Sequence, residues 1–82
     1  MARRLFAKAI YTKRQQRLCE LLKAARRKAK LTQHDLAQRL GIYKSFVSRY
    51  ERGQRRLDAI EFLAVAEALK LDPAEVLEEV RG

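Results

Sequence analysis

The sequence predicts an all-α protein in which five helices enclose one small hydrophobic core. Three segments begin with a polar residue that can cap a helix and carry an acidic residue three positions later, the spacing of a capping box. Two glycines stand where such segments would end, and apolar residues recur at helical rather than strand spacing. The only weak strand-like alternation covers residues 5–11. A chain of 82 residues has the size of a single domain.

The first predicted helix covers residues 13–30. Thr12 is placed as its cap, and Gln15, three residues later, completes a capping box. One face of this segment is consistently apolar, and its members are Leu18, Leu21, Leu22, Ala25 and Ala29. Residues 1–11 are interpreted as either a basic N-terminal arm or an extra turn of helix, so the helical domain is assigned to residues 12–82.

The next two predicted helices cover residues 33–40 and 44–52. Thr32 and Asp35 supply the capping box of the first, and Gly53 ends the second. Because only three residues join these short helices, they must cross steeply, and specific residues must fill and turn the angle between them. Those residues are Leu36, Ala37, Leu40, Gly41, Ile42, Val47 and Tyr50. This pattern is typical of a helix-turn-helix.

The last two predicted helices cover residues 59–69 and 73–80. Each begins with a capping box, and the two pairs are Asp58 with Glu61 and Asp72 with Glu75. Pro73 falls at the first helical position, where its missing N–H costs nothing. Apolar positions around the last helix exceed what one small core needs. We therefore expect a dimer contact there, at Leu71, Val76, Leu77 and Val80.

Charge divides the chain into a basic front and an acidic end. The formal net charge is +9, and residues 1–30 hold eleven Lys or Arg against one acidic residue. Residues 57–82 hold two basic residues against seven acidic ones. This asymmetry favours an anionic partner that contacts one side of the protein. Nucleic acid is the favoured candidate, and an anionic membrane surface is the second. The longest apolar run, residues 62–66, is too short to cross a bilayer, and the single cysteine fits a reducing cytoplasm.

The segment 44–52 has two distinct faces when its residues are spaced by about 100°. Val47 and Tyr50 point inward, whereas the outward face is polar and cationic. Such a face can enter the major groove of DNA and read base edges, so four residues are predicted to face bases: Lys44, Ser45, Ser48 and Arg49. Lys44 fits a phosphate contact equally well. Arg52, Gln54, Arg55 and Arg56 follow this segment and are predicted to contact phosphates.

Residues 18–80 resemble the Cro-like, or xenobiotic-response-element (XRE), family of bacterial and phage regulators. The resemblance is carried by Leu-Thr-Gln-His-Asp-Leu-Ala from Leu31, by Gly41, and by Ser-Phe-Val-Ser-Arg-Tyr-Glu-Arg-Gly from Ser45. It implies a five-helix, phage-repressor-like DNA-binding fold that binds an operator as a homodimer and regulates transcription. It also implies that Gln33 touches phosphate and braces the start of segment 44–52.

The same resemblance implies an ion pair between Arg26 and Glu51 that ties the first helix to segment 44–52. The chain departs from the family pattern at two positions. Many relatives carry glutamine at Lys44, and many carry Ser, Thr or Pro at Tyr43, so the segment lacks the usual side-chain cap. A guanine or phosphate contact can replace an adenine contact at Lys44.

No residue pattern indicates an enzyme. His34 has no second ligand at metal-binding spacing, Cys19 has no catalytic base, and no phosphate-binding glycine loop occurs, so neither metal nor cofactor is expected. We therefore predict a repressor that binds double-stranded DNA. The alternative is an antitoxin that neutralises a toxin protein and regulates its own operon. A third class is an RNA- or ribosome-associated module.

Overall fold

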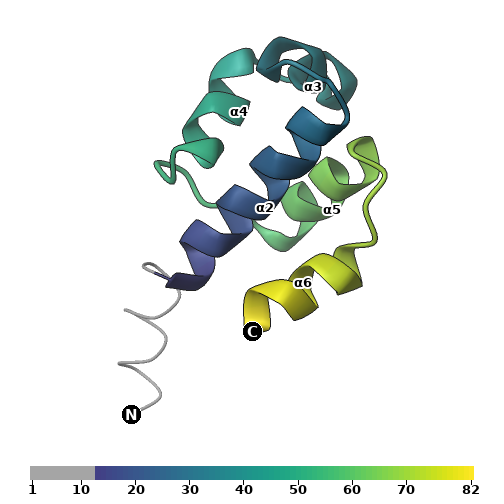
Figure 1. Ribbon diagram of the computed structural model, residues 1–82. Helices are drawn as coiled ribbons and strands as arrows, with labels where there is room; N and C mark the ends of the chain where they lie inside the picture. The colour runs from purple at the N-terminus through teal and green to yellow at the C-terminus, as the bar shows by residue number, and fades with distance from the viewer. Residues whose placement is uncertain (1–12) are drawn as a thin grey trace.

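The computed structural model describes residues 13–82, and within them it contains five α-helices and no strand (Figure 1). Their bounds are Gln15–Lys28 (α2), Gln33–Leu40 (α3), Lys44–Glu51 (α4), Ala59–Ala68 (α5) and Pro73–Arg81 (α6). All five predicted helices are confirmed, with ends that coincide with the predicted ones or differ by at most two residues. Thr12 and the segment 1–11 lie outside the described residues.

Two of the three predicted capping boxes in the described residues are present. At α3 the Asp35 backbone N–H donates to Thr32 Oγ1 at 3.0 Å, and the Thr32 N–H donates to Asp35 Oδ2 at 2.9 Å. Asp58 and Glu61 make the same reciprocal pair at α5. The box predicted at Asp72 is wrong, because its carboxylate accepts from the Ala74 N–H instead. Its ψ of 112°, against 169° and 175° at the other two caps, directs the carboxylate to this earlier N–H.

Four helix ends share one geometry, in which a residue with a left-handed backbone lets the chain fold back on the last turn. Gly41 (φ 68°) ends α3 and Gly53 (φ 76°) follows α4, as the sequence predicts. Lys30 (φ 61°) and Lys70 (φ 58°) do the same after α2 and α5. Each is followed by a backbone bond back across five residues, such as Ile42 N–H to Ala37 C=O at 3.0 Å. Sequence reasoning missed both lysines, because lysine, unlike glycine, carries no signal for a left-handed helix end.

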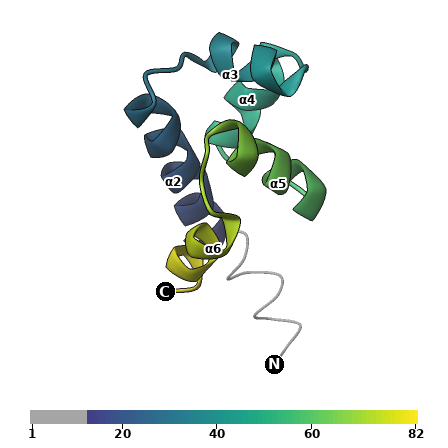
Figure 2. The ribbon, with the colours of Figure 1, turned by 90° about the vertical axis from the view of Figure 1, so that its right-hand side faces the viewer.

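The core lies where all five helices meet. α3 and α4 pack against each other, α4 also packs on α2, and α6 packs on α2 and α5. The buried residues that form it are Leu22, Leu36, Ala37, Val47, Tyr50, Phe62, Val65, Leu69 and Val76. In both views α3 and α4 lie at one end of the molecule and α6 at the other (Figures 1 and 2). None of the helices in residues 13–82 has the length and apolar character that a membrane crossing requires.

Two groups of predicted positions lie elsewhere than expected. Ile42 does not fill the angle between α3 and α4, since it is 40% exposed and lines a shallow groove beside Phe46. Its place directly after the left-handed Gly41 turns it away from the core. In α6, Val76 is a core residue and is not available for a dimer contact, because this helix closes the core between α2 and α5.

The other three residues of the predicted dimer contact differ in exposure. Leu71 and Val80 are half-buried and pack against the core. Leu77 is 50% exposed, so it is the only one of these four residues that is exposed.

Candidate nucleic-acid interface

Helix α4 separates a buried face from an exposed one. Val47 and Tyr50 are fully buried against α2 and α3. On the other side Ser45 and Arg49 are exposed, and Ser48 is half-buried between the two faces. Lys44, at the first position of the helix, is exposed as well. The helix lies at the outer edge of the molecule, at the end away from α6, so the terminal helix does not cover this face (Figures 1 and 2).

The start of α4 has no side-chain cap. Tyr43 occupies the capping position with an extended backbone, and its side chain makes no capping hydrogen bond. It is 82% exposed and directly precedes the first residue of α4. Sequence reasoning treated Tyr43 only as a missing cap. An aromatic residue directly before segment 44–52 is the signal that could have identified it as an exposed ring next to α4.

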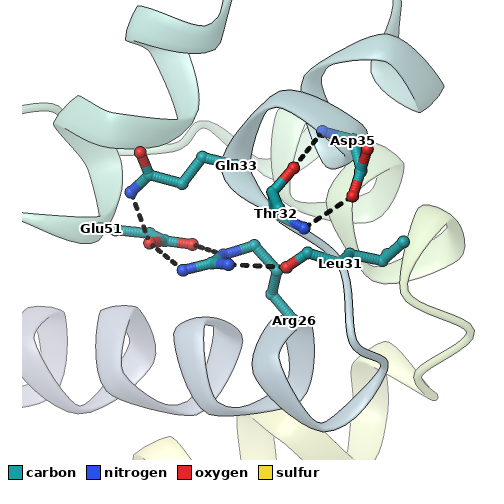
Figure 3. Close-up of polar contacts among 6 residues, drawn as sticks. All are labelled: Arg26, Leu31, Thr32, Gln33, Asp35 and Glu51. Atoms are coloured by element: carbon teal, nitrogen blue, oxygen red, sulfur yellow. Dashed lines mark hydrogen bonds and ion pairs between the residues drawn. The ribbon is translucent and has the colours of Figure 1, made fainter.

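The far end of α4 is fixed by a buried ion pair, shown in Figure 3. Arg26 of α2 donates from Nε to Glu51 Oε2 at 2.7 Å and from Nη2 to Glu51 Oε1 at 3.1 Å. A third bond runs from Arg26 Nη1 to the Leu31 carbonyl at 2.7 Å. The two side chains are only 9% and 2% exposed. Hydrogen bonding to Glu51 raises the pKa of Arg26 above its ordinary value, so the guanidinium stays charged.

Gln33 joins this pair instead of bracing the start of α4. Its Nε2 donates to Glu51 Oε1 at 3.0 Å, which places it at the last residue of the helix (Figure 3). Gln33 is the first residue of α3, directly after the Thr32 cap, and the steep crossing brings that point to the end of α4. The resemblance names the wrong end of α4, because the partner of Gln33 depends on how the helices cross.

The residues after α4 divide into two kinds. Arg52, Gln54 and Arg56 are exposed. Arg55 is half-buried, and its Nη1 and Nη2 donate to Glu61 Oε1 and Oε2 at 2.9 and 2.8 Å. Nη1 also donates to the Arg56 carbonyl at 3.0 Å. Arg55 is therefore bound to the start of α5.

Glu61 has two roles in this contact. Hydrogen bonds from Arg55, and then from the Asp58 backbone N–H, lower the pKa of its carboxyl to about 2. The hydrogen bond to Glu61 in turn raises the pKa of Arg55. Sequence reasoning found Glu61 only as a capping residue. A basic residue six positions before it, across a short loop, is too weak a signal to predict the pair.

The two residues considered as metal ligand or nucleophile, His34 and Cys19, do not belong to the exposed face of α4. His34 is exposed at the start of α3, and Cys19 is buried on α2, where burial raises the pKa of its thiol. Among residues 13–82, no three His, Cys, Asp or Glu side chains gather as a metal site would require. The described surface around α4 is polar and cationic and offers hydrogen-bond donors, because Ser45 and the basic side chains of this helix are exposed.

Comparison with known proteins agrees with this geometry. A helix-turn-helix family model matches residues 22–76, from the middle of α2 into α6. An XRE-family-like protein from Pseudomonas syringae pv. tomato str. DC3000 is 42% identical, and the match covers 94% of each chain with a TM-score of 0.84. No curated protein sequence matches the chain.

Two further solved structures are similar over most of the chain. The clp gene regulator ClgR from C. glutamicum is 26% identical over 84% of this chain and 90% of its own, with a TM-score of 0.76. The restriction-modification controller protein C.AhdI from Aeromonas hydrophila is 32% identical over 80% of this chain and 94% of its own, with a TM-score of 0.72. The predicted fold class is confirmed, and the family is one of DNA-binding proteins and not of enzymes. This chain belongs to the XRE family of helix-turn-helix DNA-binding transcriptional regulators.

Proposed function

We propose that this protein is a repressor that binds a specific two-fold operator as a homodimer and inserts α4 into the major groove. The observation that carries the proposal is the division of α4, which anchors Val47 and Tyr50 in the core while Ser45 and Arg49 are exposed. An α-helix fits the major groove, and its exposed polar side chains can then reach base edges.

Each exposed side chain has a chemical task in this proposal. Arg49 reads guanine through its N7 and O6 acceptors, and the serine hydroxyls of Ser45 and Ser48 pair with base edges of either kind. Lys44, at the start of the helix, contacts a base or the adjoining phosphate. Backbone phosphates are bound by residues around the two ends of the motif: Gln33, Arg52, Gln54 and Arg56.

Regulation of transcription is supported by what similar proteins are called. ClgR is a clp gene regulator, and C.AhdI is a restriction-modification controller. Repression requires only that the bound protein occupy a promoter and exclude the polymerase. A dimer places two copies of α4 on half-sites about 34 Å apart, one helical turn of DNA.

We place the dimer contact around Leu77, the most exposed of the four apolar residues that the sequence singles out in this region. Leu71 and Val80 border it as half-buried residues. In sedimentation, Leu77→Glu is expected to shift the protein towards monomer while its helical content stays unchanged. An unchanged sedimentation profile would place the contact elsewhere.

Selection of bound duplexes from a random pool tests the proposed function directly. We expect enrichment of one sequence with two-fold symmetry and half-sites one helical turn apart. Retention of duplexes without any enriched sequence would contradict specific recognition. An enriched sequence without two-fold symmetry would contradict the dimer.

A further inference from the structure

We propose that Arg55 is a positioning residue for α4, the recognition helix of the proposed function, and that it does not bind a DNA phosphate. This inference rests on the proposed function. The starting observation is that Arg55 joins two helices. Its guanidinium makes two parallel hydrogen bonds to Glu61 of α5, at 2.9 and 2.8 Å. Its central carbon lies 4.6 Å from the centroid of the Phe46 ring on α4.

The hydrogen-bonding capacity of the guanidinium is largely used within the protein. Glu61 takes both terminal nitrogens in the fork geometry that matches a carboxylate, and the Arg56 carbonyl accepts a third bond at 3.0 Å. A phosphate would have to compete with a carboxylate that is already paired. Glu61 is itself held in place, because its Oε1 accepts from the Asp58 backbone N–H at 2.9 Å.

Arg55 also contacts α4, through the ring of Phe46. Phe46 is half-buried, and a shallow apolar groove of about 90 Å³ lies between it and Val65 of α5. Phe46 also packs edge-on against the buried ring of Tyr50, with centroids 5.8 Å apart. A cation above an aromatic ring is attracted to it, so the contact with Arg55 restrains the Phe46 ring.

Together with the Arg26–Glu51 pair, this contact restrains α4 near both ends. Arg26 holds the last residue of the helix from α2, and Arg55, in the loop before α5 and bound to Glu61, contacts Phe46 near the first turn. The first turn carries Lys44 and Ser45, which we assign to base reading. A recognition helix that can tilt presents these side chains less accurately, so loss of the Arg55 contact is expected to reduce discrimination between sequences.

The test uses the full chain with Arg55→Gln, Arg55→Lys, Glu61→Gln and the double variant Arg55→Gln/Glu61→Gln. Glutamine at position 61 preserves the capping hydrogen bond while removing the charge pair. Lysine at position 55 preserves the charge but not the two-pronged bond. Arg52→Gln is the matched control, since it removes one exposed charge at the other side of the same loop.

The first measurement is the affinity for the selected duplex and for random duplex over a range of salt. We expect Arg55→Gln, Arg55→Lys and Glu61→Gln each to weaken binding to the selected duplex about threefold to fivefold, as expected for a half-exposed pair and a cation–aromatic contact. The salt slope and the affinity for random duplex stay at wild-type values. The double variant is no weaker than either glutamine variant alone.

A phosphate ligand gives the opposite pattern. Arg55→Gln would then lower the salt slope by about one, as the loss of a phosphate contact does. Arg55→Lys would retain wild-type affinity, and Glu61→Gln would tighten binding to every duplex by releasing the arginine. That pattern would overturn the proposal.

The second measurement needs no DNA, so it separates this inference from the proposed function. In the free protein, amide hydrogens of residues 47–51 are expected to exchange faster in Arg55→Gln and Glu61→Gln, and at the wild-type rate in Arg52→Gln. Unchanged exchange in Arg55→Gln would overturn the positioning role. A wild-type protein that binds no duplex would contradict the proposed function while leaving this readout intact.

Discussion

Glu51, the last residue of α4, is tied to Arg26, in the last turn of α2, by two hydrogen bonds of 2.7 and 3.1 Å. Both side chains are nearly buried, and Gln33 adds a third hydrogen bond to the same carboxylate. The residue that ends the recognition helix is therefore attached to α2 and α3 at once. The strength of this attachment can be measured.

Glu51→Gln is expected to destabilise the protein by about 3 kcal/mol or more, because it leaves the Arg26 guanidinium buried without a counter-charge. Urea denaturation followed by circular dichroism measures the loss. Glu67→Gln, on the exposed side of α5, is the control and is expected to change little. The double replacement Arg26→Met/Glu51→Leu should cost less than Glu51→Gln alone. Equal losses from Glu51→Gln and Glu67→Gln would contradict the role of the pair.

Tyr50→Phe is expected to increase the free energy of unfolding by about 1 kcal/mol. The Tyr50 Oη is buried and has no hydrogen-bond partner among the described residues, and an unsatisfied buried polar atom is costly. Burial also raises the pKa of this phenol, since the phenolate would be poorly solvated. Thermal melting tests the change, with Tyr43→Phe at an exposed position as the control. A lower melting temperature for Tyr50→Phe would show that the hydroxyl has a partner in solution.

Lys30→Gly and Lys70→Gly are each expected to stabilise the protein by about 1 kcal/mol. Both lysines adopt a left-handed backbone, which is costly for a residue with a Cβ and free of strain for glycine. The control is Lys28→Gly, inside the last turn of α2, where glycine should instead cost up to about 1 kcal/mol. The urea midpoints of the three variants, compared with that of the wild type, measure these changes in stability. Destabilisation by all three would mean that glycine acts only through the flexibility of the unfolded chain.

The Arg55–Glu61 pair is expected to contribute to stability at neutral pH and to be lost in acid. The pKa of Glu61 falls from 4.5 to about 2 in the folded protein. A lowered folded pKa gives a contribution that is complete above pH 4.5 and disappears as the pH falls towards 2. The stability difference between wild type and Glu61→Gln should therefore shrink over that interval. A difference that stays constant from pH 6 to pH 2 would contradict the assignment.

Arg49→Ala is expected to weaken binding to the selected duplex by about 1–3 kcal/mol and binding to random duplex far less, because a base contact carries sequence information. Arg52→Ala is the matched comparison, expected to weaken both duplexes similarly and to lower the salt slope by about one. Titrations at several salt concentrations measure both effects. If Arg49→Ala weakened both duplexes equally, Arg49 would be a phosphate contact.

Local patterns along the chain were enough to predict the helices and the two faces of α4. Capping residues, glycine stops and the repeat of apolar positions act within a few residues, so they are visible without a structure. The caps at Thr32 and Asp58 show this, and so does the burial of Val47 and Tyr50 opposite Ser45 and Arg49. The ion pair of Arg26 with Glu51, which the structure contains, was implied by family resemblance and not by any local pattern.

Contacts between side chains that are distant in the chain became visible only in the packed fold. Gln33 lies at the end of α4 and not at its start, Val76 fills the core, and Arg55 turns to Glu61. These outcomes depend on the crossing angles of the helices and on the path of the loop after α4. Both result from packing the whole core, and no periodicity within a single helix records them.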